Sequence, residues 1–243
     1  MPDLSATATI DLWEAAERLA PVERSLALAA AADASAPDVD ELARLPLGRR
    51  DARLLGLHAA LAGWSLEATA PCPACGEQGE FAVDASALLA QAPETRAPVP
   101  VEADGFVVVW RPPDSRDVAA AASAGDAAAA ESVLLGRCVT AVHGPDGEIE
   151  AAALPTEVRD AVSRAMGDAD PLAEVLVNVA CPSCETVFIA DVDVGGFVWA
   201  EVQALAQRLL REVDALARAY GWTEAEVLGL GERRRAAYLE LAR

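Results

Sequence analysis

Two short cysteine loops constrain the fold of this chain more than any other feature. Both have the pattern Cys-Pro-x-Cys, and together they contain four of the five cysteines, namely Cys72, Cys75, Cys181 and Cys184. A gap of two residues lets the paired thiolates converge on one point, as half of a tetrahedral zinc site requires. We expect extended segments on both sides of each loop, at residues 66–70 and 80–83, and at residues 174–180 and 186–192. Two such units that face each other would form a zinc ribbon.

The distance between the loops along the chain is unusual. In total, 105 residues separate Cys75 from Cys181, whereas the pairs of one zinc motif usually lie about 15–20 residues apart. A single ion bound by both loops would therefore join two distant parts of the chain. Because no histidine or carboxylate base is placed beside the loops as catalytic zinc requires, we expect one structural zinc per chain.

Two other uses of the cysteines remain open at this stage. A thioredoxin-like pair is one, but neither loop opens a helix after a strand in an evident βαβ unit. Disulfides are the other; the chain opens without a secretory signal, which favours a reducing, cytoplasmic setting. Cys138 lies in an apolar run, and we expect it to be a buried free thiol.

The charge balance limits the partners. The formal net charge is −20, and all 19 basic residues are arginine. Such a charge repels phosphate backbones, so we expect no binding to nucleic acid. It is compatible with solubility alone or with docking on a basic protein surface. No apolar run is long enough to cross a membrane, so we expect no membrane-spanning segment.

Helix signals dominate the rest of the chain. Asp11 is a candidate cap for a first helix, and Pro21 is a candidate first residue of the helix at 22–32. Gly221 should end the longest helix, at 197–220, and Thr223 with Glu226 should form a capping box. Further helices are expected at residues 39–44, 49–62, 85–91, 115–123, 127–137, 156–166 and 232–243, with a turn at 33–38, a linker at 92–100, a buried strand at 106–110 and a hairpin around 144–147.

The fold expected from these signals is α+β and mainly helical, with the helices around a small β element built on the split four-cysteine zinc ribbon. We divide the chain into an N-terminal helical segment (1–44), a central α+β region with both loops (45–196) and a C-terminal helical region (197–243). His58 shares an apolar helix face with Leu54, Leu55 and Leu61, so we expect a half-buried imidazole with its hydrogen bonds satisfied, not a ligand.

We expect no enzymatic activity. The sequence has no glycine-rich phosphate loop, no Gly-x-Ser-x-Gly elbow and no His-Glu-x-x-His motif. The Gly195-Gly196 pair is isolated before a helix. Two histidines provide little material for general base catalysis.

Several segments, taken in their order, resemble one protein family. They are 45–51 (LPLGRRD), 54–55 (LL), the extended segment before the first loop together with 72–77 (CPACGE), 134–139 (LLGRCV), 169–171 (ADP), 197–201 (FVWAE), 209–213 (LLREV) and 219–226 (AYGWTEAE). Together they resemble the baseplate hub assembly chaperone family of T-even-like contractile-tailed phages and of phage-derived contractile injection systems. The likeness extends from about residue 45 to the end.

The resemblance implies a non-enzymatic protein that assembles a contractile tail baseplate or is a component of it. Its partners would be baseplate or hub proteins, and it could become part of a phage-like particle. The alternatives are a zinc-ribbon adaptor of transcription or translation and a thiol redox protein. For the partner surface we expect the region 197–243, with Trp199, Trp222 and Tyr238 as contact residues, unless the C-terminal segment folds back and covers the apolar stripe of the long helix.

Overall fold

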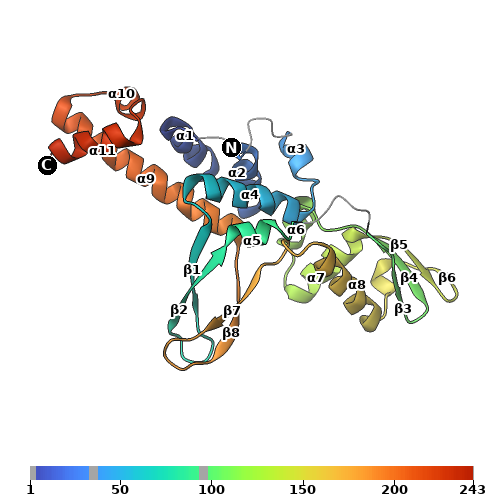
Figure 1. Cartoon of the computed structure of the whole chain (residues 1–243). Helices are drawn as coiled ribbons and strands as arrows, with labels where there is room; N and C mark the ends of the chain where they lie inside the picture. Colours follow the sequence, from blue (N-terminus) through green and yellow to red (C-terminus); the bar gives the residue numbers. More distant parts are fainter. Residues whose placement is uncertain (1–3, 33–37, 93–97, 243) are drawn as a thin grey trace.

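The computed structural model describes residues 4–32, 38–92 and 98–242. Figure 1 shows a helical body from which two β-hairpins project side by side, with a second lobe of helices and strands next to it. The prediction of an α+β, mainly helical chain is confirmed. The described residues form three small sheets, however, where we expected one small β element.

Four helices build the body: α1 (Ala6–Ala16), α2 (Pro21–Ala31), α4 (Leu47–Leu61) and α9 (Val194–Tyr220). The long helix α9 packs against each of the other three. Their shared core contains the fully buried side chains of Leu28, Leu54, Leu55, Leu57, Val198 and Val202. Val202 of α9 is therefore part of the core that these helices share.

Two helices begin three or more residues earlier than predicted, because other residues cap them. α1 begins at Ala6, not after Asp11, since the Ser5 hydroxyl accepts a hydrogen bond from the Ala8 N–H (3.2 Å). α9 begins at Val194, since the Asp193 carboxylate accepts one from the Gly196 N–H (3.0 Å). The Gly195-Gly196 pair therefore lies inside the first turn. Pro21 at the start of α2 and the Thr223–Glu226 capping box are confirmed.

The two projecting hairpins are β1 (Ser65–Pro71) with β2 (Gln78–Asp84), and β7 (Leu176–Ala180) with β8 (Val187–Asp191). Each leads directly into a helix that begins after an aspartate cap: Asp84 before α5 (Ala85–Leu89) and Asp193 before α9. Strand character on both sides of each cysteine loop is as predicted. The expected turn at 33–38 and the linker at 92–100 lie largely outside the described residues.

The second lobe is a small antiparallel sheet with helices packed on it. Its strands, in the order β3–β4–β5–β6, are Val101–Ala103, Phe106–Trp110, Val139–Gly144 and Gly147–Glu148. Its helices are α6 (Ser115–Ala121), α7 (Ala127–Cys138), the short 3₁₀ turn η1 (Ala151–Ala153) and α8 (Thr156–Ala169). Val108, Val142, Val158 and Val162 form the centre of this core. The predicted buried strand and hairpin are confirmed, and the four-stranded sheet that combines them was not foreseen.

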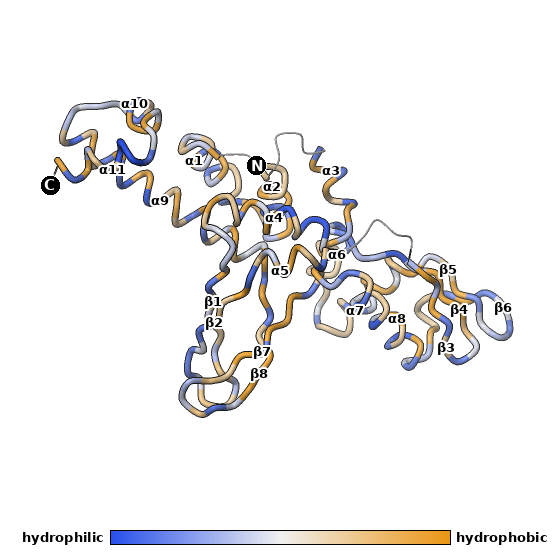
Figure 2. Tube along the Cα trace, viewed as in Figure 1, coloured by the Kyte–Doolittle hydropathy of each residue, from blue (hydrophilic) through white to orange (hydrophobic). Residues whose placement is uncertain are grey.

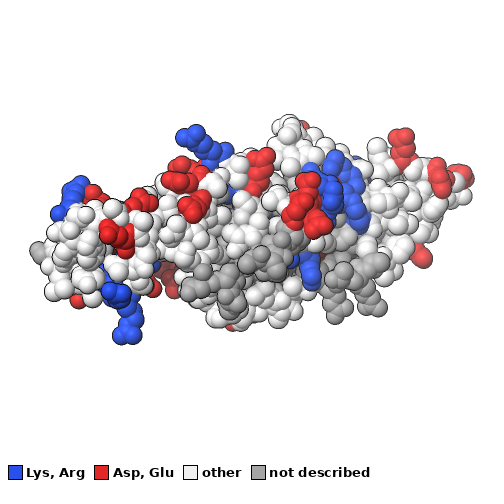
Figure 3. All heavy atoms as spheres, turned by 90° about the horizontal axis from the view of Figure 1, so that it is seen from above, with Lys and Arg blue, Asp and Glu red and all other residues white. Residues whose placement is uncertain are grey.

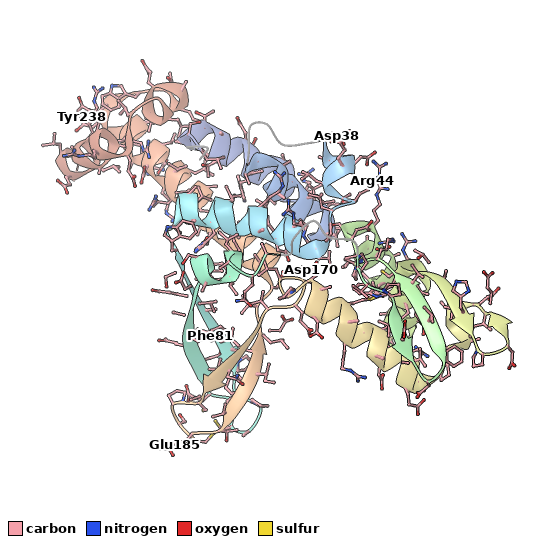
Figure 4. All side chains as sticks on the ribbon, turned by 45° about the vertical axis from the view of Figure 1, so that its right-hand side comes forward. Asp38, Arg44, Phe81, Asp170, Glu185 and Tyr238 are labelled. Atoms are coloured by element: carbon pink, nitrogen blue, oxygen red, sulfur yellow. The ribbon has the colours of Figure 1, made fainter. Side chains whose placement is uncertain are left out.

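The start of α4 joins the lobe to the helical body. The Gly48 N–H donates to the buried Asp170 carboxylate (2.9 Å), which lies at the end of α8. The Leu47 N–H donates to the Pro113 carbonyl (3.2 Å). A cavity of about 550 Å³ opens next to this junction, between α7 and the end of α8. Asp170 is labelled at this junction in Figure 4.

The C-terminal segment folds back on the far end of α9. It consists of α10 (Glu224–Leu228) and α11 (Glu232–Leu241), which follow the left-handed cap at Gly221 (φ 68°). Leu228 is buried against Ile10 and Leu209. The apolar stripe is therefore covered from within the chain at this end, which is the second of the two arrangements considered above. α3 (Val39–Leu42) completes the described helices.

The three consecutive arginines of α11, Arg233 to Arg235, have two different environments. Arg233 and Arg234 are exposed, whereas Arg235 is buried and donates to the Glu212 carboxylate of α9 (2.7 Å). Figure 3, which views the side away from the hairpins, shows acidic and arginine side chains interspersed over the helices. Among the described residues, no helix combines the length and the apolar character needed to cross a membrane.

Candidate metal centre

The two cysteine loops have the same backbone. In the first, the Cys72 N–H donates to the Glu77 carbonyl (2.8 Å) and the Gly76 N–H donates to the Cys72 carbonyl (2.9 Å). In the second, the Cys181 N–H donates to the Thr186 carbonyl (3.0 Å) and the Glu185 N–H donates to the Cys181 carbonyl (3.1 Å). Each pair of bonds closes a tight turn that turns both sulfurs of its loop to the same side.

One position in each loop needs a left-handed backbone. Gly76 (φ 77°) and Glu185 (φ 58°) are equivalent, since each lies four residues after the first cysteine of its loop. Glycine adopts this conformation without steric cost, whereas a glutamate does so at a cost. Neither position was predicted from the sequence. Glycine directly after Cys75 was the available signal, and the second loop gives no such signal.

The hairpins bring all four predicted ligands together. Cys72 Sγ lies 3.7 Å from Cys184 Sγ, and Cys75 Sγ lies 3.6 Å from Cys181 Sγ. All four sulfurs lie within 4.8 Å of one another, and the group could hold one metal ion. Each of these two close contacts joins a cysteine of one hairpin to a cysteine of the other. An ion at the centre would therefore bind the two hairpins to each other.

An apolar layer supports the sulfurs from below. The inner faces of the hairpins bury Val179, Phe188 and Ala190 beside Cys72 and Cys181. At Gly79 the hairpins approach so closely that a Cβ atom would lie 3.0 Å from Val179 Cγ1. Figure 4 shows Phe81 on the strand that faces the second hairpin, and Glu185 at the tip. Cys75 and Cys184 are exposed, so the cluster has one buried and one open side.

The pKa values of the two exposed thiols, Cys75 and Cys184, shift in opposite directions. Hydrogen bonds with the hydroxyl and the backbone of Thr186 lower the pKa of Cys184 to about 6. The backbone of Glu77 acts to lower the pKa of Cys75, but the neighbouring sulfurs of Cys184 and Cys181 outweigh it and raise that pKa to about 12. A cation that binds the four sulfurs as thiolates would therefore release at least the proton of Cys75.

The remaining cysteine lies outside this cluster. Cys138 is a buried free thiol, as predicted, and its S–H donates to the Asp117 carboxylate (3.6 Å). Burial, followed by the negative charge of Asp117, raises the pKa of Cys138 to about 12. None of the five cysteines forms a disulfide in the described structure.

The other residues singled out from the sequence lie far from the sulfurs. His58 is fully buried, not half-buried; its Nδ1 lies 2.6 Å from the Glu201 carboxylate, and its Nε2 has no partner among the described residues. The expectation of a fully satisfied imidazole is therefore only half right. Trp199 lies under the Arg24 guanidinium (4.6 Å). Trp222 packs between Tyr220 and Tyr238, so both tryptophans have partners within the chain.

Comparison of the chain with protein-family models, with curated proteins and with solved structures finds no match.

Proposed function

We propose that Cys72, Cys75, Cys181 and Cys184 hold one structural zinc ion that fixes the two hairpins together. Zinc–thiolate bonds of about 2.3 Å in a regular tetrahedron place neighbouring sulfurs about 3.8 Å apart. The sulfur distances of 3.6 and 3.7 Å between the hairpins support this assignment. Four thiolates leave no open coordination position for a substrate, so the role we propose for the ion is structural.

At the level of the whole protein, we propose a non-enzymatic factor that assembles, or belongs to, the baseplate of a contractile tail or contractile injection system. This part rests on the sequence resemblance. The zinc-bridged hairpins are compatible with it, because a metal-fixed projection is a rigid surface on which other proteins could assemble.

Deletion of the gene in its organism of origin tests this role. Electron microscopy should then show no assembled contractile particles, although sheath and tube proteins are still made. Complementation with the Cys138→Ser variant should restore the particles, and complementation with Cys72→Ser/Cys181→Ser should not. Normal particles in the deletion strain would overturn the proposal. A purified protein that shifts DNA or RNA at physiological salt would favour a transcription or translation adaptor instead.

A further inference from the structure

The two hairpins are equivalent residue by residue, and this allows their surfaces to be compared directly. Cys72 and Cys181 are 109 positions apart. The same interval relates the second cysteines, the left-handed residues, the strand pairing and the aspartate caps Asp84 and Asp193. Each position in the first hairpin therefore has one counterpart in the second. In the sequence, the equivalence of the hairpins is indicated by the equal interval between each cysteine loop and its aspartate cap.

The inner faces of both hairpins are apolar, but their outer faces differ. On the first hairpin, Glu67, Gln78 and Glu80 point outward and are exposed. Their counterparts on the second hairpin are Leu176, Val187 and Ile189, which are 52%, 66% and 65% exposed. A solvent-facing strand surface is ordinarily polar. The first hairpin follows this rule and the second does not, which Figure 2 shows as a more hydrophobic trace along β7 and β8.

These three side chains form one continuous stripe. Ile189 is paired with Asn178, and Leu176 and Val187 lie on either side of that pair along the same face. Large apolar side chains gathered on an exposed face mark an interaction site more often than isolated ones do. The apolar inner face already packs the hairpin against its neighbour, so the stripe is not needed for that purpose.

Acidic side chains border the stripe. Asp191 is exposed on the same outer face, opposite Leu176. Glu174 and Asp193 are exposed at the base of the hairpin, and Glu185 is exposed at its tip. A chain with a net charge of −20 repels a second copy of itself. The charge pattern thus favours a different partner, one with basic residues around an apolar centre.

We infer that the outer face of the β7–β8 hairpin docks another protein, whose contact surface has apolar side chains within a rim of arginine or lysine. Leu176, Val187 and Ile189 are the apolar contacts, and Glu174, Glu185 and Asp191 face the basic rim. The inference does not depend on the baseplate proposal, because it rests on the difference between two equivalent hairpins of one chain.

Site-specific photo-crosslinking in the organism of origin tests this surface. A photo-reactive phenylalanine analogue is placed at Asn178, in the middle of the stripe, and in a matched control at its counterpart Thr69. We expect a crosslink from position 178 to a protein other than this chain, and a yield at least about tenfold lower from position 69. Mass spectrometry should map the crosslink to an apolar site flanked by arginine or lysine, and added salt should lower the yield.

A second experiment gives the outer face of the second hairpin the side chains of the first. Leu176→Glu, Val187→Gln and Ile189→Glu give the second hairpin the outer side chains that the first already carries. We expect the crosslink from position 178 to fall about tenfold, while the melting temperature and metal content of the purified variant stay unchanged. If the triple variant does not fold, the crosslink from position 178 is measured in Ile189→Glu alone.

Four results would overturn the inference: equal yields from positions 178 and 69, a yield that the exchange leaves unchanged, a crosslink to a second copy of this chain, or a mapped surface without basic residues. Each is independent of whether contractile particles assemble. A particle-deficient deletion strain with no crosslink from position 178 would leave the baseplate proposal intact and reject this surface.

Discussion

A glycine and an aspartate at the junction of the two lobes depend on each other. A Cβ atom at Gly48 would lie 1.9 Å from Asp170 Oδ1, so only glycine fits there. Burial raises the pKa of the Asp170 carboxyl, although the hydrogen bond from Gly48 opposes this effect. Its Oδ1 atom has no partner among the described residues. The segments LPLGRRD (45–51) and ADP (169–171) thus meet at this contact.

The helix α4 contains a matched pair of glycines that tests this contact. Gly48→Ala should destabilise the protein by about 1–3 kcal/mol, because the new methyl group displaces Asp170. Gly56→Ala should stabilise it by about 0.5–1 kcal/mol, because no atom lies within 4 Å of its added Cβ and alanine favours helix. Urea unfolding of the three proteins measures both values. Equal effects of the two substitutions would show that Gly48 is not under steric constraint.

The buried carboxylate of Asp117 in α6 joins two arginines from different parts of the second lobe. Its carboxylate accepts hydrogen bonds from Arg111 (2.6 and 2.9 Å) and from Arg137 (2.8 Å). Asp117→Asn should cost about 1–3 kcal/mol at neutral pH. The lower part of this range applies because both arginines are partly exposed and thus remain solvated.

The pH dependence of that effect has a definite sign. Burial alone would raise the pKa of Asp117, but the bonds from Arg111, from the backbone of Asp114 and from Arg137 hold it well below the usual range. Its stabilising contribution is therefore complete above the ordinary value of 3.8 and is lost as the pH falls below it. The stability difference between wild type and Asp117→Asn should be constant from neutral pH to about 5 and shrink below about 4. A difference that grows on acidification would contradict this assignment.

At the level of elements, local signals predicted more than long-range ones. Proline at a helix start, glycine at a helix end and the Cys-Pro-x-Cys loops each depend on a few neighbouring residues, and these predictions were accurate. The four-stranded sheet was missed because its outer strands β3 and β6 are only three and two residues long, and because its central strands β4 and β5 pair across the two helices that separate them in the chain. The contact between Gly48 and Asp170 spans 122 residues, and no local pattern indicates it. The convergence of the two sulfurs within each loop was predictable because their spacing is local, whereas the residue-by-residue equivalence of the hairpin strands required their pairing register.

The short helix α10 gives an element-level prediction. Leu228 fills a pocket formed by Ile10 of α1 and Leu209 of α9, so Leu228→Ala should cost about 2–4 kcal/mol. Leu241→Ala on α11 is the matched control, because Leu241 is exposed, and it should change stability by less than about 0.5 kcal/mol. Thermal unfolding of both variants checks this. An unaffected Leu228→Ala protein would mean that the C-terminal segment does not pack on α9.

At the scale of the whole molecule, the hairpins originate from distant parts of the chain but form one projection. The first leads into α5 and the second into α9, and both helices pack near the body's core (Figure 1). Ion binding at the tips would add a second connection between these parts, beyond the core itself. Loss of the ion should therefore loosen the projection first and lower the stability of the whole chain as a consequence.

The most direct test is the zinc content of purified protein, measured together with its melting temperature. We expect one zinc per chain in the wild type and in Cys138→Ser, whose thiol lies outside the cluster. We expect no bound zinc and a large fall in melting temperature for Cys72→Ser/Cys181→Ser, since structural zinc sites bind with about 10–16 kcal/mol. A folded, metal-free wild type whose melting temperature the double substitution leaves unchanged would contradict the proposed zinc site.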